Sequence, residues 1–282
     1  MQTRRPRHDE HTEVMEALTG GIDVTLAMLL WLLAAGALAG WIDAVVGGGG
    51  LIQLPALLLV PGMTPVQAVA TNKVGSIAGT TASAVTYLRK ITPDRSATIP
   101  AAATAFLGAV LGAKLATFIP SDLFTPIILL ALIGVGLFTV LNPSLGADAS
   151  LRFGESSKRH HGLSWLIGLV IGVYDGVLGP GTGSFLVIAF VTLIGFSFLQ
   201  ASATAKVINW ATNFGALVYF IPDGQVVWAL GLVVAVGNVL GGIFGARTAL
   251  KQGSGFVRVV FVVVVSAMIL KLGYDVIAGL IH

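Results

Sequence analysis

Apolar residues dominate this chain and fall into about ten stretches, separated by short polar or glycine-rich breaks. In the first half they cover residues 24–46, 51–60, 66–88, 99–119 and 123–141, and in the second half residues 163–178, 184–195, 200–221, 226–250 and 257–281. A helix needs roughly 20 apolar residues to cross a bilayer, so the long stretches predict membrane helices. The second stretch of each half is too short to cross and predicts a half-helix or a re-entrant segment.

The two halves repeat each other at an offset of 132 to 133 positions. The matched pairs include Asp43 and Asp175, Gly47 and Gly179, Thr71 and Thr204, and Lys73 and Lys206. Apolar stretches resemble one another by chance, but charges inside them rarely recur at a fixed offset. The pattern therefore indicates an internal duplication, which is typical of membrane transporters.

Loop charges predict how the halves are oriented. The loop after the third stretch contains Arg89, Lys90 and Arg95, whereas its counterpart at 222–225 has no basic residue. In the next pair of matched loops the basic residues lie in the second half instead of the first. Because basic loops stay in the cytoplasm, equivalent loops should lie on opposite sides, which predicts an inverted repeat of five segments each. If the short segments do not cross, a parallel repeat of four crossings is the alternative.

Composition supports a membrane fold. The chain is 55% hydrophobic and 10% charged, with a mean hydropathy of +0.91, against roughly 25% charged in soluble domains. We predict an all-α polytopic membrane protein with two homologous halves. The predicted organisation is a polar tail at 1–21, a first transmembrane repeat at 22–141, a cytoplasmic linker at 142–162 and a second repeat at 163–282. No stretch remains for a soluble domain, which argues against an enzyme.

Several kinds of chemistry are excluded by residue usage. The chain has no Cys, and its histidines lie in the tail, the predicted central loop or the last position: His8, His11, His160, His161 and His282. Neither a metal site nor a cofactor is therefore expected in the membrane core. The net charge of +3 comes from basic loops beside the lipid bilayer and gives no reason to expect nucleic acid.

Glycine runs interrupt the chain at the end of the first apolar stretch of each half. They are Gly47–Gly50 and Gly179–Gly183, and the second contains Pro180. Close helix packing is one interpretation of membrane glycines. Consecutive glycines also unwind a helix, and the free N–H groups at the start of the next helix suit an anion. The expected contact residues in these runs are Gly48, Gly49, Gly50, Gly181, Thr182 and Gly183.

Two lysines are the strongest candidates for binding a substrate. Lys73 and Lys206 lie about eight residues into long apolar stretches, too deep to reach the surface easily. Hydroxyl and amide groups lie next to them in sequence. We predict substrate contacts from Lys73, Lys206, Thr71, Asn72, Thr204 and Asn209.

Asp43 and Asp175 lie one helical turn before the glycine runs. They either form ion pairs with Lys73 or Lys206 that only stabilise the bundle or take up protons that couple to transport. Lys114 and Arg247 are weaker candidates for the same ion-pair or coupling role. If all six groups were buried and ionised, the two extra positive charges would need compensation, which a small anionic substrate would supply.

These residues resemble the signatures of the sulfite exporter TauE/SafE family. The likeness rests on the Gly40-x-x-Asp43-x-x-x-Gly47 pattern with its glycine run, on Pro55, Ala68–Lys73 and Tyr87, and on Asp175, Gly179–Gly183 and Ala203–Lys206. The resemblance covers about residues 22–279. It implies a permease of the bacterial cytoplasmic membrane for small sulfur-containing anions, such as sulfite or organosulfonates. A passive anion channel or a permease for another small anion is the alternative. Protons or another coupling ion, the direction of transport and the oligomeric state stay open.

Overall fold

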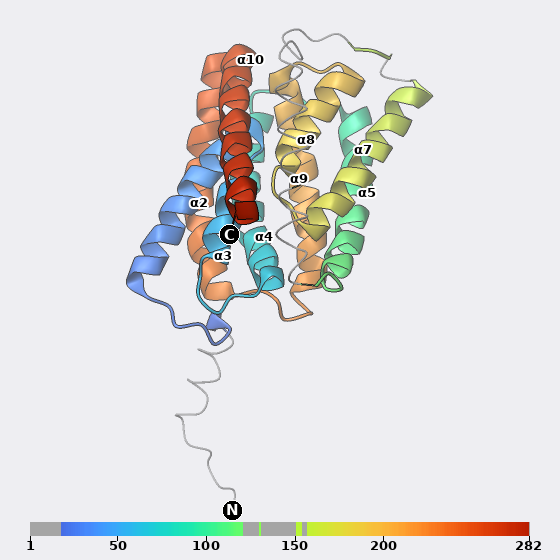
Figure 1. The fold of residues 1–282 in the computed structure, drawn as a ribbon. Helices are drawn as coiled ribbons and strands as arrows, with labels where there is room; N and C mark the ends of the chain where they lie inside the picture. The colour runs from blue at the N-terminus through green and yellow to red at the C-terminus, as the bar shows by residue number, and fades with distance from the viewer. Residues whose placement is uncertain (1–17, 121–129, 131–150, 154–156, 282) are drawn as a thin grey trace, which may run out of the picture.

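The structure, a computed structural model, describes residues 18–120, 130, 151–153 and 157–281, and every regular element in that part is a helix. The elements are α2 (Leu26–Val46), α3 (Gly50–Leu58), α4 (Pro65–Leu88), α5 (Arg95–Ala116), α7 (Lys158–Val177), α8 (Thr182–Ala189), the π-helix η1 (Phe190–Ile194), α9 (Phe198–Phe220) and α10 (Trp228–Ile281). Three of the helical spans, 26–46, 95–116 and 228–257, are long and apolar enough to cross a membrane. The all-α membrane class is confirmed (Figure 1).

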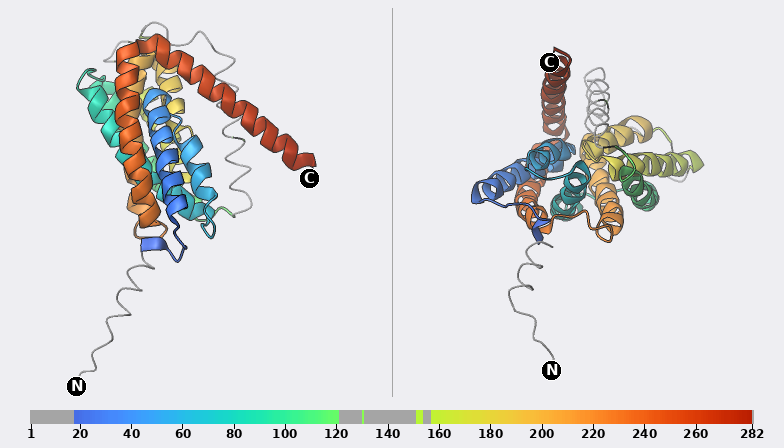
Figure 2. Two further views of the ribbon diagram at one scale, coloured as in Figure 1. Left: turned by 90° about the vertical axis from the view of Figure 1, so that its left-hand side faces the viewer. Right: turned by 60° about the horizontal axis from the view of Figure 1, so that its bottom comes forward.

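One predicted boundary differs from the structure. The linker was expected to reach residue 162, but α7 begins at Lys158, because the side chain of Ser157 accepts a hydrogen bond from the N–H of Arg159 and caps the helix. The last two stretches carry one label, α10, but Gly253 has a non-helical backbone, with φ 78° and ψ −174°, and separates two helices between the predicted stretches 226–250 and 257–281 (Figure 2). The stretch 123–141 apart from residue 130, the tail at 1–17 and most of the linker lie outside the described residues.

Small residues set the directions of neighbouring helices. Gly36 of α2 packs on Val234 of α10, and Gly40 packs on Asn238, so the contacts advance together and the two helices run parallel. A Cβ at Gly40 would lie only 2.4 Å from the carbonyl oxygen of Asn238, so the two backbones touch. Contacts of Gly172 with Ala105 and of Gly176 with Ala109 likewise make α7 parallel to α5.

The two halves consequently run in opposite directions. Gly75 and Gly79 of α4 contact Val234 and Asn238, which makes α4 parallel to α10 and therefore to α2. A short loop reverses the chain between α4 and α5, so α5 and its parallel partner α7 are antiparallel to α2. Opposite directions of α2 and α7 are what an inverted repeat requires. The short helices α3 and α8 turn back toward the side from which α2 and α7 came, so that each forms a helical hairpin with the helix before it (Figure 1).

The helices form two bundles that have exchanged their fourth helices. The α4 bundle contains α2, α3, α4 and the part of α10 before Gly253, and the α9 bundle contains α5, α7, α8 and α9. Thus α5 of the first half packs against α7 and α9, while α10 of the second half packs against α2 and α4 (Figure 2). The two bundles meet mainly along α4 and α9.

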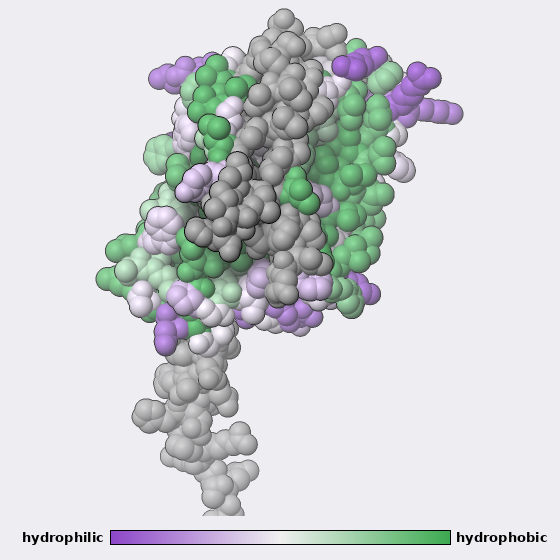
Figure 3. Space-filling model, viewed as in Figure 1, coloured by the Kyte–Doolittle hydropathy of each residue, from purple (hydrophilic) through white to green (hydrophobic). Residues whose placement is uncertain are grey.

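Charge differs between the two ends of the molecule. At one end, called the basic end here, α4 finishes, α5, α7 and α9 begin and α10 bends. Its basic residues include Arg89, Lys90, Arg95, Arg152, Lys158, Arg159, Arg247 and Lys251. At the opposite end Lys114 is the single basic residue in the described part of the chain. Hydrophobic side chains cover the sides between these ends, as the visible face shows (Figure 3).

Candidate functional site

Both predicted glycine runs lie where helices end. Gly47 caps α2 with φ 81°, and α3 starts three residues later. After α7, Gly179 and Gly181 have φ values of 90° and 79°, and α8 starts at Thr182. These are left-handed conformations that favour glycine. The glycines therefore end α2 and α7 inside the protein, at the side where each bundle faces the other.

The two interrupted turns touch each other. The backbone N–H of Ser184 donates to the carbonyl of Gly47 at 3.1 Å, and its hydroxyl donates to the carbonyl of Val46 at 2.8 Å. A Cβ at Gly47 would lie 2.2 Å from the carbonyl carbon of Gly183. Glycine is thus required on both sides, and this contact joins the two bundles near their centre.

Each of the two buried lysines pairs with an aspartate of the other half. Lys73 Nζ lies 2.9 Å from Asp175 Oδ2, and Lys206 Nζ lies 2.7 Å from Asp43 Oδ2. Each ammonium also donates to the backbone carbonyl of the same aspartate. Those carbonyls lie in the last turns of α7 and α2, the negative ends of the helix dipoles. Since α4 and α2 belong to one bundle and α9 and α7 to the other, both ion pairs cross the interface.

The two ion pairs lie at different depths. Helix α4 starts at the end opposite to the basic end, and Lys73 is eight residues past this start. Helix α9 starts at the basic end, and Lys206 is eight residues past that start. At a rise of 1.5 Å per residue, each lysine lies about 12 Å along its helix from the first residue of that helix. The Lys206–Asp43 pair is therefore nearer the basic end and the Lys73–Asp175 pair nearer the opposite end.

The two pairs also differ in their surroundings. The hydroxyl of Thr182 lies 2.6 Å from Asp175 Oδ1 and 2.8 Å from the carbonyl of Gly179. Residue 50, which the offset matches to Thr182, is a glycine, so Asp43 lacks this hydroxyl. Asp43 is 14% exposed and Asp175 only 2%. The pair nearer the basic end is thus the more accessible of the two.

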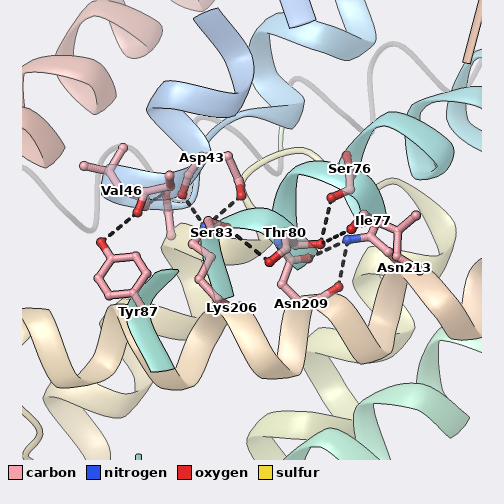
Figure 4. A network of polar contacts seen from close by, with 12 residues as sticks. Asp43, Val46, Ser76, Ile77, Thr80, Ser83, Tyr87, Lys206, Asn209 and Asn213 are labelled. Atoms are coloured by element: carbon pink, nitrogen blue, oxygen red, sulfur yellow. Dashed lines mark hydrogen bonds and ion pairs between the residues drawn. The ribbon is translucent and has the colours of Figure 1, made fainter. Parts of the chain in front are cut away.

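A polar seam follows the interface between α4 and α9 (Figure 4). It consists of Ser76, Thr80 and Ser83 on α4 and of Asn209 and Asn213 on α9. Thr80 donates to the carbonyl of Ser76 and Asn213 to that of Asn209, each at 2.7 Å, so these groups are satisfied within their own helices. Polar side chains at a bundle interface allow a hydrated path when the bundles separate.

The predicted neighbours of the lysines have different roles. The hydroxyl of Thr71 accepts a hydrogen bond from the backbone N–H of Val227 at 3.0 Å, which fixes the start of α10. In contrast, Asn72 Oδ1 and Thr204 Oγ1 are buried and have no hydrogen-bond partner in the described structure. A buried polar atom without a partner costs free energy. A bound substrate or water would supply the partner that each lacks.

Two residues of this region were missed by the sequence analysis. Gln53 of α3 donates through Nε2 to the carbonyl of Asn72 at 2.9 Å, and Asn238 of α10 donates to Gln53 Oε1. All three side chains are at most 3% exposed. The signal was a single amide inside an otherwise apolar stretch, which is uncommon in a membrane helix.

The excess of buried positive charge, expected only if all six groups are buried, does not arise. Lys114 and Arg247 are exposed at the surface, because both lie close enough to a helix end for their long side chains to reach it. Lys73 and Lys206 are balanced by Asp175 and Asp43. The buried lysine and aspartate side chains at the interface are therefore electrically neutral as pairs.

One histidine also differs from expectation. His160 was placed in a central loop, but it lies in the first turn of α7 and is fully buried. Its Nε2 lies 2.9 Å from Oδ2 of Asp94, which caps α5. Partial burial raises the pKa of Asp94, but hydrogen bonds from Ser96 and the nearby His160 outweigh this and hold the pKa below its usual value. This contact ties the start of α5 to the start of α7.

Known proteins are similar to this chain over nearly its whole length. The family described as Sulfite exporter TauE/SafE matches residues 32–272. The "Probable membrane transporter protein YfcA" of Escherichia coli (strain K12) is 36% identical over 263 residues, which are 93% of this chain and 95% of that protein. The "Probable membrane transporter protein ORF9" of Sinorhizobium sp is 37% identical over 255 residues, 90% and 95% of the two chains. A "Probable membrane transporter protein" of Haemophilus influenzae is 34% identical over 259 residues, 90% and 98%. No solved structure matches.

Proposed function

The chain belongs to the sulfite exporter TauE/SafE family, a family of membrane transporters and not of enzymes, and on this premise we propose that it carries small sulfur-containing oxyanions, such as sulfite or organosulfonates, across the bacterial cytoplasmic membrane. The observation that supports this most is the pair of buried lysine–aspartate contacts between the bundles. The polar seam beside them gives a solute a lining that is not pure hydrocarbon. The basic residues at one end support a cytoplasmic location for that end.

Charge balance suggests how an anion binds. A neutral ion pair that accepts an anion would leave one net negative charge in a low-dielectric site, which is costly. If the aspartate first takes up a proton, the freed ammonium and the anion form a neutral pair instead. We therefore propose that anion binding at Lys73 or Lys206 accompanies protonation of Asp175 or Asp43.

The different depths of the two pairs suggest alternating access. Opening the interface at the basic end breaks the contact between Lys206 and Asp43, while the contact between Lys73 and Asp175 keeps the opposite end closed. Release on the other side requires the reverse. The moving bodies in this proposal are the α4 bundle and the α9 bundle, so neither sequence repeat moves as a unit.

Sulfite flux in proteoliposomes tests the assigned site. Replacing Lys73 or Lys206 with alanine should lower the flux at least about tenfold, because a lost charge-assisted hydrogen bond costs about 1.5–3 kcal/mol. Lys114→Ala is the matched control, since this lysine is exposed and lies outside the interface. Circular dichroism and gel filtration show whether each variant is folded. Normal flux in both folded lysine variants would exclude the assigned site.

Proton coupling has its own test. In the wild-type protein an inward proton gradient should drive sulfite uptake against its concentration gradient. Asp175→Asn keeps the shape and the hydroxyl contact of Thr182 but cannot be protonated, so flux should lose its dependence on the proton gradient while downhill exchange persists. Uphill uptake by Asp175→Asn equal to that of the wild type would reject the coupling role.

A further inference from the structure

A pocket at the basic end is lined by four basic side chains. It has a volume of about 590 Å³ and lies between the end of α4, the start of α9 and the part of α10 just before Gly253. Its cations are Arg89 and Lys90 from the end of α4 and Arg247 and Lys251 from α10. Thr86 adds a hydroxyl, and Leu199 of the other bundle forms one wall.

No acidic side chain of the described residues balances these charges. The pocket lining contains neither Asp nor Glu, and none of the four cations makes an ion pair in the part of the chain that the structure describes. Arg247 and Lys251 are four residues apart on one helix, where like charges destabilise it. The helix dipoles favour a cation at the end of α4 or α10. They do not explain why cations of both helices line one cavity, where concave walls concentrate positive potential.

The position of the pocket links it to the nearer ion pair. Leu199 precedes Lys206 by seven residues on α9, a rise of about 10 Å. Thr86 is next to Tyr87, whose buried hydroxyl donates to the carbonyl of Ala44, one residue after Asp43. The pocket therefore lies between the basic end and the Lys206–Asp43 pair, and buried side chains such as Tyr87 separate the pocket from the pair.

We propose that this pocket binds an oxyanion group at the cytoplasmic face. Arginine guanidinium groups hold two oxygens of a sulfite, sulfate, sulfonate or phosphate group at once, and the lysines add charge without fixed geometry. The group is either that of a free anion or that of a phospholipid headgroup. In the first case the pocket is the cytoplasmic waiting site for the transported anion, a role that rests on the proposed function.

Binding to the purified full-length protein tests the pocket directly. The probe is inorganic sulfate, titrated in a neutral detergent by calorimetry or thermal shift. The double variant Arg247→Gln/Lys251→Gln and the single variant Arg89→Gln should each weaken binding about tenfold or more. The control is Lys158→Gln/Arg159→Gln, which removes the same charge from the same end but outside the pocket. Equal affinity of the pocket variants and the control overturns the proposal.

A thiol probe separates the two sources of the oxyanion. Because the chain has no Cys, Leu250→Cys places a single thiol in the lining. Sulfate should slow its modification by a negatively charged thiol reagent in phosphatidylcholine vesicles if the ligand is a free anion. If the ligand is a headgroup, phosphatidylglycerol should slow it without sulfate. Protection by neither rejects the site.

The two proposals fail separately. If the pocket variants bind sulfate normally while Lys73→Ala and Lys206→Ala abolish flux, the pocket proposal fails and the transport site stands. If the pocket variants lose sulfate binding while both lysine variants transport normally, the pocket stands and the transport site fails.

Discussion

At the residue scale, each buried lysine satisfies a carboxylate and a backbone carbonyl of the same aspartate. The aspartate lies in the last turn of a helix that ends inside the protein, so the ammonium compensates both a formal charge and a helix dipole. Removing one partner would leave a buried charge without compensation, which is far more costly than breaking a surface pair.

Glycine at the contact of the two turns gives a residue-scale prediction. Gly47→Ala should abolish folding or lower the melting temperature sharply, because its Cβ would overlap the backbone of Gly183. Gly62→Ala is the matched control, since Gly62 has nearly the same φ, 82° against 81°, but nothing within 4 Å of its Cβ. The control should cost only about 1 kcal/mol, the backbone strain alone. Thermal unfolding in detergent compares the two, and similar losses would mean that the turn contact contributes nothing.

Residue chemistry and the ion pairs between these lysines and aspartates were readable from the sequence, but which lysine pairs with which aspartate was not. Lys73 and Lys206 stood out because a lysine so deep in an apolar stretch needs a reason. Their partners depend on how the bundles pack, which no spacing along the chain reports. Arg247 and Lys114 are weaker candidates in the sequence because they lie near helix ends, and both are exposed in the structure. Gln53 is a single polar residue in an apolar stretch. The repeat does not support it, because its matched position in the second half is the apolar residue Leu186.

At the element scale, the contact between α5 and α7 depends on how α5 begins. Asp94 accepts hydrogen bonds from the N–H groups of Ser96 and Ala97 and also contacts His160. One carboxylate therefore caps a helix of the first half and holds the first turn of a helix of the second half. The helix positions were predictable because caps and glycine breaks are local signals; the exchange of α5 and α10 between bundles is not local and was not predicted.

Replacing this cap should destabilise the protein in a pH-dependent way. Asp94→Ala should cost about 1 kcal/mol through the lost cap and more through the unpaired His160. Asp94→Asn keeps the cap and removes the charge, so it isolates the charge contribution. Because the pKa of Asp94 is lowered by folding, this contribution is present above the unfolded pKa of 3.8 and is lost as the pH falls through the lower folded pKa. Melting temperatures of Asp94→Asn and wild type should converge in acid; a difference that grows in acid would contradict this.

At the scale of the whole molecule, two bundles meet along a surface that contains ion pairs, hydroxyls and amides. Small residues let neighbouring helix backbones touch within each bundle. The buried apolar residues form two clusters, and each cluster includes residues of both bundles, so the interface is apolar in part and polar at the ion pairs and the seam. Polar interfaces tolerate separation and hydration better than apolar cores, so motion between the bundles is the expected conformational change.

Topology at this scale has a direct test. Lys90→Cys and Asp223→Cys each introduce the single thiol of the chain, in loops at equivalent positions of the two halves. With inverted halves, a membrane-impermeant maleimide should label Asp223→Cys in intact cells and Lys90→Cys only after lysis. The wild-type chain, which has no Cys, controls for background. Labelling of both thiols from one side would indicate parallel halves.

The exchange of α5 and α10, together with lysines that find their counterions across the repeat, bears on ancestry. A single unduplicated copy of this fold would insert a lysine without a counterion and a fourth helix without a neighbour. Two such copies, inserted upside down relative to each other, would satisfy both needs at once. Before gene fusion, the ancestor would thus have functioned as an antiparallel homodimer of dual topology, and separately expressed halves of the present chain should be stable only together.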